Sequence, residues 1–229
     1  MVDDLGFVKF PRTPHLFVMG HDAPRGDKLV EMVLAADLLG RPAVVEEKID
    51  GTNLGISVDE SGRLRAQNRG SYVEPGSEPQ YQPLGRWLAA RSGLREQLGT
   101  QLILFGEWCF ARHTVHYDAL PDWFLAFDVY DRGARRFWPA SRRDAFCAEL
   151  GIAVVPVLGH RVSGRAAIEA LFGPSKVAST PMEGVYLRWE VGGWLEHRAK
   201  VVRAGWVPPD EQHWKARPLE PNQLARARS

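Results

Sequence analysis

Short runs of apolar residues, separated by polar and glycine-rich turns, predict that this chain is built mainly from strands. Two of the runs, 102–108 and 123–130, are apolar almost throughout, which is typical of strands buried on both faces. Gly192-Gly193 separates two others and predicts a tight hairpin between them. The predicted strands are 43–48, 54–58, 63–69, 102–108, 123–130, 184–190 and 194–203.

Helical spacing of apolar residues predicts helices between some of these strands. In the first, Leu29, Val30, Val33, Leu34 and Leu38 would face the core. Ser141 and Ser163 are placed to cap two later helices. The helices are predicted over 27–39, 84–98, 141–150 and 164–172, with a short one at 210–216; residues 5–17 read as an extended packed segment and 70–83 as a surface loop.

Composition predicts one well-cored domain and limits its partners. The chain has 229 residues, 45% of them hydrophobic, and a formal net charge of +1, so nucleic acid would have to bind a local basic patch. Cys109 and Cys147 lack metal-ligand spacing and read as buried reduced thiols. The start of the chain lacks a signal-peptide pattern, and no apolar run approaches the ~20 residues of a membrane span, so we expect a cytoplasmic protein that does not enter membranes.

One stretch carries the first candidate chemistry. Residues 47–53 read Glu-Lys-Ile-Asp-Gly-Thr-Asn and follow the apolar run Ala43-Val44-Val45. Asp50-Gly51 is a turn signal, so we expect a hairpin that presents the Lys48 amine at the edge of a cleft. Taken alone, the stretch fits a charged surface hairpin equally well, because short motifs match by chance.

Further ionisable residues stand at the ends of predicted strands. A nucleophilic lysine needs a lowered pKa, which nearby cations or a metal would supply. Two acids in one cleft can hold a divalent metal with its waters, and basic groups can hold a phosphate chain. Together they suit attack of an amine on a nucleoside triphosphate. The set comprises Lys48, Arg69, Glu107, Glu183, Arg198 and Lys200.

The order of these motifs resembles the covalent nucleotidyltransferases, which are the polynucleotide ligases and mRNA capping enzymes. Lys-X-Asp-Gly is followed by Phe-Gly-Glu at 105–107, Phe-Asp-Val-Tyr at 127–130, Glu-Gly-Val at 183–185 and Arg-X-Lys at 198–200. Thr52-Asn53 is similar to the RNA ligase 2-like branch, and residues 9–16 resemble the start of its small bacterial members. The resemblance covers about residues 8–203. It implies an α+β ligase adenylation domain with antiparallel-rich sheets, flanking helices and an ATP cleft.

The resemblance also implies a reaction that uses ATP and Mg²⁺ or Mn²⁺. Lys48 would attack the α-phosphorus of ATP and form lysyl-AMP, and the AMP would pass to an RNA 5′-phosphate that a 3′-OH then seals. Glu107 would bind the ribose or metal waters, and Glu183 the metal. Phe127 would stack on adenine, and Arg69 would contact the ribose or the incoming phosphate. Core packing is the alternative for Phe127, a solvated strand end for Arg69, and a plain salt bridge for each acid.

The remaining roles follow from the same resemblance. Arg198 and Lys200 match the catalytic pair on the α-phosphate, although many relatives have lysine at the first position, and the planar guanidinium can alter the approach. Asn53 would help to position the phosphate or metal waters. The backbone of Glu47 would read the base, and Asp50 would sustain the turn.

Strand sealing requires a firm hold on the RNA, and the predicted domain organisation bears on where that hold comes from. We expect an adenylyltransferase domain over 1–203 and a basic tail over 204–229 that is too short for the OB-fold many ligases add. Residues 198–229 contain seven Lys or Arg and three Asp or Glu, so this basic stretch could contact RNA phosphates. A partner such as an end-healing kinase or phosphatase could also help to hold the RNA.

Two other classes of function stay open at this point. A DNA ligase or a GTP-dependent capping guanylyltransferase would share the lysine chemistry, although Thr52-Asn53 and the missing OB-fold argue against both. A non-catalytic nucleic-acid-binding module is the other alternative. Retention of every charged position argues against it, since isolated buried charges are costly to keep.

Overall fold

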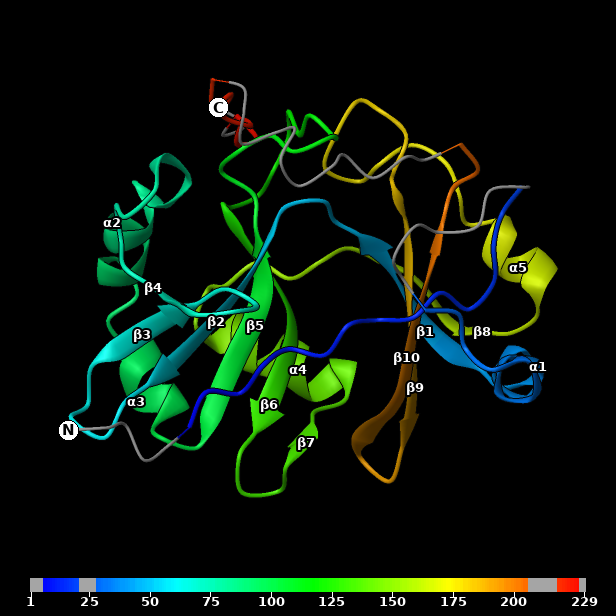
Figure 1. Cartoon of the computed structure of the whole chain (residues 1–229), viewed down its shortest axis with the longest axis horizontal. Helices are drawn as coiled ribbons and strands as arrows, with labels where there is room; N and C mark the ends of the chain where they lie inside the picture. Colours follow the sequence, from blue (N-terminus) through cyan, green and yellow to red (C-terminus); the bar gives the residue numbers. More distant parts are fainter. Residues whose placement is uncertain (1–5, 21–27, 206–217, 227–229) are drawn as a thin grey trace.

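The chain folds into two antiparallel sheets that lie side by side. The computed structural model describes residues 6–20, 28–205 and 218–226. One sheet has the strand order β10-β9-β1-β8 and the other β4-β3-β2-β5-β6-β7, and every pair of neighbouring strands is antiparallel (Figure 1). Helices flank both sheets, so the predicted α+β class is confirmed.

The connections between elements range from the tight turn at 192–193 to the long loop 109–123. The four-stranded sheet contains β1 (Ala43–Lys48), β8 (Val157–Val162), β9 (Gly184–Val191) and β10 (Trp194–Val202). The six-stranded sheet contains β2 (Thr52–Val58), β3 (Leu64–Gln67), β4 (Tyr72–Val73), β5 (Leu102–Trp108), β6 (Phe124–Asp131) and β7 (Arg136–Phe137). The helices are α1 (Met32–Gly40), α2 (Leu84–Ala89), α3 (Leu94–Leu98), α4 (Ala140–Glu149) and α5 (Arg165–Glu169), with a 3₁₀ turn at Pro79–Tyr81. Within the described ranges, no helix is long and apolar enough to cross a membrane.

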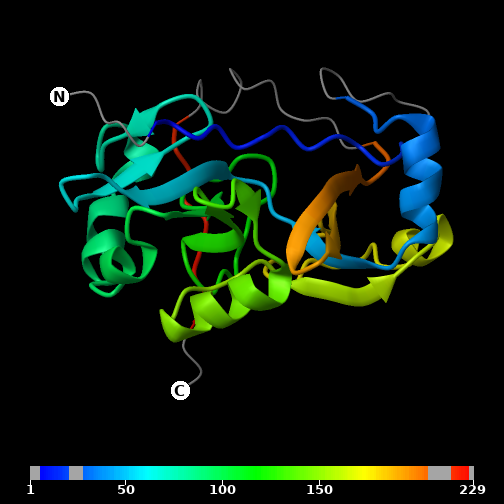
Figure 2. The same ribbon diagram turned by 90° about the horizontal axis from the view of Figure 1, so that it is seen from below.

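Each sheet has its own apolar core. Leu54 and Leu104 of the six-stranded sheet pack with α2, α3 and α4, whereas Val45 and Leu187 of the four-stranded sheet pack with α1 and α5. The extended segment 6–20 runs across both sheets, on the side opposite α4 (Figure 2). Phe10 from this segment is buried on Phe105, which confirms the predicted extended, packed segment.

The predicted hairpin around Lys48 is wrong. β1 pairs with β8 and β9, whereas β2 pairs with β3 and β5, so residues 49–51 cross from one sheet to the other (Figure 1). A local turn signal does not specify which strands pair, and here each of the two strands pairs on both sides with other strands. Gly51 does not have a positive φ; it is required because a Cβ there would lie 2.7 Å from the Trp108 carbonyl oxygen.

The first predicted helix begins five residues late, which exposes part of its expected core face. Met32 and Val33 are 82% and 74% exposed, and Leu29 lies outside the helix in a bridge to His15. Only Leu38 of the helix is fully buried. The helical spacing includes Leu29 and Val30, but in the structure these two residues belong to an extended stretch before the helix.

Other helix boundaries also differ from the sequence pattern. The predicted helix 84–98 is divided into α2 and α3 around Ser92-Gly93, because glycine weakens a helix interior. Neither predicted serine cap forms: α4 begins after Pro139 and α5 after Gly164, without a side-chain cap. The helix predicted at 210–216 lies outside the described residues.

The sequence pattern did not predict three of the strands. β4 lies within the predicted surface loop, β7 has two residues, and β8 contains Gly159 and follows Pro156. Two-residue strands carry no detectable alternation, and glycine and proline argue against a strand in sequence. The hairpin at Gly192-Gly193 is confirmed, with both glycines at positive φ.

Both cysteines are free and buried, as the sequence predicts. Burial raises the pKa of Cys147 to about 12 and holds that of Cys109 well above its usual value. Since the thiolate is the reactive form, we expect neither thiol to react with a thiol-specific reagent at pH 8 in the folded protein, and both to react in denaturant. Rapid labelling of the folded protein would contradict this arrangement.

Candidate active site

Lys48 stands at the end of β1, where the chain leaves the four-stranded sheet. Its ammonium Nζ donates a hydrogen bond of 2.6 Å to Oε2 of Glu183. Glu183 directly precedes β9, and its neighbour Gly184 is the strand partner of Lys48. Lys48 is 22% exposed and Glu183 7%, so the pair is shielded from most of the solvent.

Two more carboxylates approach the lysine from the other side. Glu107 on β5 accepts a hydrogen bond of 3.0 Å from the Gly51 N–H. Asp50 has its carboxylate held by the backbone N–H groups of Thr114 and Val115, at 2.8 and 3.0 Å. The structure thus sets three acids near one ammonium: Glu107 on β5, Glu183 just before β9, and Asp50 in the crossing between the sheets.

The acids dominate the electrostatics of this group. Burial raises the pKa of Glu107 to about 8 and that of Glu183 to about 7, although the Lys48 charge lowers both. For Lys48, burial lowers the pKa, but Glu183, Asp50 and Glu107 together outweigh burial and raise it. The expected lowering of the Lys48 pKa by neighbouring cations is therefore wrong for the protein without ligands, because its nearest neighbours are carboxylates. A bound divalent cation would favour the ionised forms of Glu107 and Glu183, whose carboxylate oxygens are the ligands that such a cation prefers.

Two further predicted residues lie with this group. Asn53 is the strand partner of Glu107, and its buried Oδ1 has no hydrogen-bond partner among the described residues. Arg69 is exposed just after β3, close enough to Glu107 to lower the pKa of that carboxyl. An unpaired buried acceptor and an exposed guanidinium beside the same carboxylate are suited to hold a polar ligand.

The donor set fits a hydrated divalent metal held together with phosphate. Within the part of the chain that is described, no group of three or more His, Cys, Asp or Glu side chains could ligate a metal. Mg²⁺ commonly binds one or two carboxylates and completes its shell with waters and substrate phosphates. Glu107 and Glu183 fit that pattern.

Phe127 occupies a β-bulge in β6. Phe105 pairs with Asp128 and Gly106 with Ala126, so Phe127 is the extra residue between them. Its ring is partly buried, with its centroid 5.1 Å from that of Phe10. Bulges often redirect a side chain beside an active site, but stacking of Phe127 on adenine stays a prediction.

Arg198 and Lys200 differ in their surroundings. Arg198 is 12% exposed, donates to Asp128 Oδ2 at 2.9 Å, and stacks 3.9 Å from the Phe137 ring centroid. Lys200 lies close enough to Glu183 to lower the pKa of that carboxyl. The structure thus brings Lys200 to the group around Lys48 and engages Arg198 with Asp128 instead.

Asp128 belongs to a buried ionic network that joins the two sheets. Arg188 on β9 contacts Asp128 on β6 at 2.6 Å, and Arg143 on α4 contacts Glu46 on β1 at 2.6 Å. Both guanidinium groups also donate to the Phe127 carbonyl. Sequence reasoning missed this network, although acids embedded in apolar strands were its visible signal.

Glu47 is held inside the protein by both its backbone and its side chain. Its carboxylate accepts hydrogen bonds from the Ser175 hydroxyl at 2.5 Å and the Lys176 N–H at 2.8 Å. Its own N–H donates to the Pro156 carbonyl. Glu47 thereby holds the loop at Ser175 and Lys176 in place. Recognition of the base by the Glu47 backbone stays a prediction.

Comparison with known proteins identifies the class. A family model described as RNA ligase matches residues 41–202, which is more than half of the chain. The chain belongs to this RNA ligase family. A search of curated proteins found no match.

Solved structures of an RNA ligase from Naegleria gruberi share the fold. A lysine-to-alanine variant with ATP and manganese has a TM-score of 0.60 at 17% identity, over 73% of this chain and 51% of that one. The same ligase with pyrophosphate has a TM-score of 0.60 at 16% identity, over 89% of this chain and 60% of that one. The chain spans between about half and three fifths of the length of these ligases. The match confirms the α+β adenylation-domain fold.

Proposed function

We propose that this protein is an ATP-dependent RNA ligase that carries AMP on Lys48. The observation that supports this most directly is the Lys48 ammonium, 2.6 Å from Glu183 and with three acids near it, within a domain of the RNA ligase family. Some of the Naegleria gruberi ligase structures hold ATP and manganese, which makes ATP and a divalent metal the reactants to test first. We propose residues 1–203 as the adenylyltransferase domain.

The first step needs Lys48 as a neutral amine. A divalent metal bound at Glu107 and Glu183 would supply positive charge that offsets the acids and the triphosphate. The Lys48 nitrogen would then form a bond to the α-phosphorus while the bond to pyrophosphate breaks, and the amine proton would pass to solvent. Lys200 and Arg69 would face the phosphate chain, and the unpaired Oδ1 of Asn53 would orient a metal-bound water or a hydroxyl of the nucleotide.

The next two steps complete strand sealing. A 5′-phosphate oxygen of RNA attacks the same phosphorus and releases Lys48, which regains a proton. A 3′-OH then attacks the activated 5′-phosphate, forms the phosphodiester and releases AMP. Arg198 is held by Asp128 in the protein alone, so a contact between Arg198 and phosphate requires it to leave that partner.

The test is intact mass after incubation with ATP and Mg²⁺ or Mn²⁺, followed by peptide mapping. We expect an AMP adduct on the peptide that contains Lys48, and sealing of nicked RNA in preference to nicked DNA. An adduct with GTP alone would instead indicate a capping enzyme. Absence of an adduct with any nucleotide, from protein first freed of bound AMP, would leave a non-catalytic nucleic-acid-binding module.

A further inference from the structure

The segment 218–226 returns to the loop that follows β5. Pro221 forms a bridge with Ala111, and Leu224 forms one with Leu120. The Arg112 N–H also donates to the Glu220 carbonyl at 2.8 Å. The chain left β10 in the four-stranded sheet, and this segment lies against a loop of the six-stranded sheet, 109–123.

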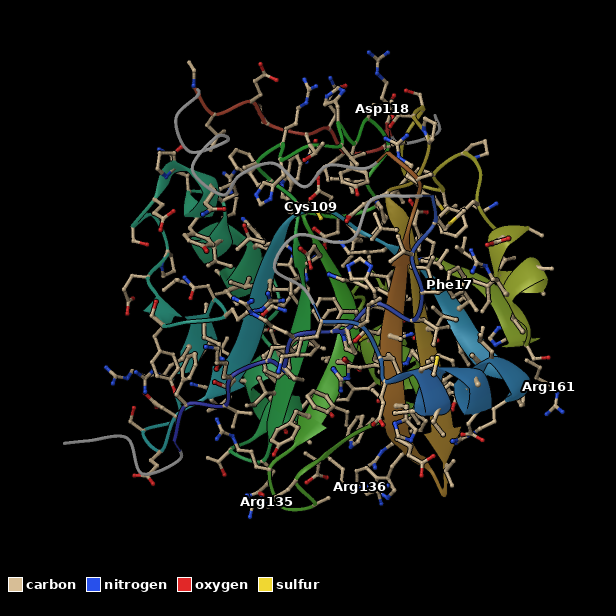
Figure 3. All side chains as sticks on the ribbon, turned by 45° about the vertical axis from the view of Figure 1, so that its right-hand side comes forward. Phe17, Cys109, Asp118, Arg135, Arg136 and Arg161 are labelled. Carbon is tan, nitrogen blue, oxygen red and sulfur yellow. The ribbon has the colours of Figure 1, made fainter. Side chains whose placement is uncertain are left out.

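Asn222 is the only side chain of this segment that is buried, at 3% exposed. Its Oδ1 accepts from the Tyr117 N–H at 2.9 Å, and its Nδ2 donates to the carbonyls of Cys109 at 2.8 Å and Ala111 at 3.3 Å. One amide side chain therefore ties the start of the loop, at Cys109 and Ala111, to its middle, at Tyr117. Cys109, labelled in Figure 3, lies just beyond the end of β5 that carries Glu107.

The same loop holds the residue two positions after Lys48. The Asp50 N–H donates to the Tyr117 hydroxyl at 2.7 Å, and the Asp50 carboxylate accepts from Thr114 and Val115. Tyr117 is 1% exposed, so its ring has no freedom to follow a displaced Asp50. Asp50 thus has its amide and its carboxylate fixed by a loop that Asn222 also holds.

We propose that Asn222 and the segment 218–226 position Lys48 for attack on the nucleotide. The path runs from Asn222 to Tyr117, from the Tyr117 hydroxyl to Asp50, and from Asp50 along the backbone to Lys48. This inference rests on the proposed lysyl-AMP chemistry. It gives this part of the chain a role in the first step, separate from any contact between basic tail residues and RNA.

The positioning role has a specific kinetic expectation. Displacing a nucleophile by about 1 Å can cost on the order of a hundredfold in rate while leaving substrate binding intact. We therefore expect Tyr117→Phe, which removes one hydroxyl, and Asn222→Ala to lower the rate of AMP-adduct formation at saturating ATP by about tenfold to a hundredfold. The half-saturating ATP concentration should change by less than about threefold, because neither side chain is among those proposed to contact the nucleotide.

The experiment is single-turnover adduct formation followed by intact mass, with a melting curve for each variant. Gln223→Ala is the matched control, because its side chain is exposed and alanine keeps the backbone hydrogen bonds. Tyr117→Phe decides the matter if Asn222→Ala does not fold. A folded Tyr117→Phe that reacts at the wild-type rate, or that changes only the half-saturating ATP concentration, overturns the inference.

The two proposals fail in different ways. If the wild type forms lysyl-AMP and the Tyr117 variant matches it, the positioning role is wrong and the proposed function stands. If the wild type forms no adduct with any nucleotide, the proposed function is wrong and the positioning role falls with it.

Discussion

Protein carrying Lys48→Ala is expected to form no AMP adduct and to seal no RNA that bears an ordinary 5′-phosphate. The nitrogen of Lys48 is the nucleophile of the first step, and alanine offers no atom that can replace it. Lys200, a cation of the same group, lies on β10 and acts on Glu183 from a different strand. The measurement is intact mass after incubation with ATP and Mg²⁺ or Mn²⁺.

RNA that already carries AMP on its 5′-phosphate provides the control for this variant. The last step needs the metal and the phosphate-binding groups but not the lysine nucleophile, so Lys48→Ala should still seal that substrate. Loss of both reactions would mean that the substitution disrupts the site as a whole, since Glu183 then loses its 2.6 Å partner. An AMP adduct on the variant would show that another residue is the nucleophile.

Arg188→Met is expected to destabilise the fold more than any exposed substitution. Arg188 is fully buried and contacts Asp128 at 2.6 Å, Glu190 at 3.3 Å and Glu46 at 3.9 Å. Methionine fills much of the same volume but removes one of the two guanidinium partners that the buried Asp128 carboxylate has among the described residues, so that only Arg198 remains beside it. Breaking a buried ion pair from one side typically costs about 3–5 kcal/mol, and we expect a loss of that size in the free energy of unfolding.

Urea unfolding measures this loss against a matched variant. Arg95→Met makes the same exchange at an exposed position of α3 and should change the free energy of unfolding by less than about 0.5 kcal/mol. Equal effects from the two variants would show that the buried network does not stabilise the fold. Arg135 precedes β7 and Arg136 begins it, and both lie at the end of the sheet opposite to Cys109 (Figure 3).

The sequence placed most of the candidate site in advance because each residue sits at the end of an apolar run. Lys48, Asn53, Glu107 and Glu183 do lie together in the structure. An ionisable group at the end of a strand lies where the sheet itself ends along the strand direction, whatever the order of the strands. Arg69 also fits this logic.

The sequence could not tell which strands pair. Asp50-Gly51 predicts a turn equally well between two paired strands and between two sheets, because the choice depends on β8 and β9, the partners of β1, which lie more than a hundred residues away. A similar separation hid the role of Asn222, whose three hydrogen bonds reach loop residues more than a hundred positions earlier. The pairing of Arg198 with Asp128, 70 positions earlier, is also non-local, and no local pattern in the sequence predicts it.

The crossing at residues 49–51 has a consequence for how the protein is made. Lys48 and Glu107 are synthesised early, whereas Glu183 follows Lys48 by 135 positions and Asn222 comes near the end. A growing chain therefore cannot assemble the reactive lysine environment until Glu183 and Asn222 have left the ribosome. Incomplete translation products of this protein would carry the lysine but remain inert toward nucleotide.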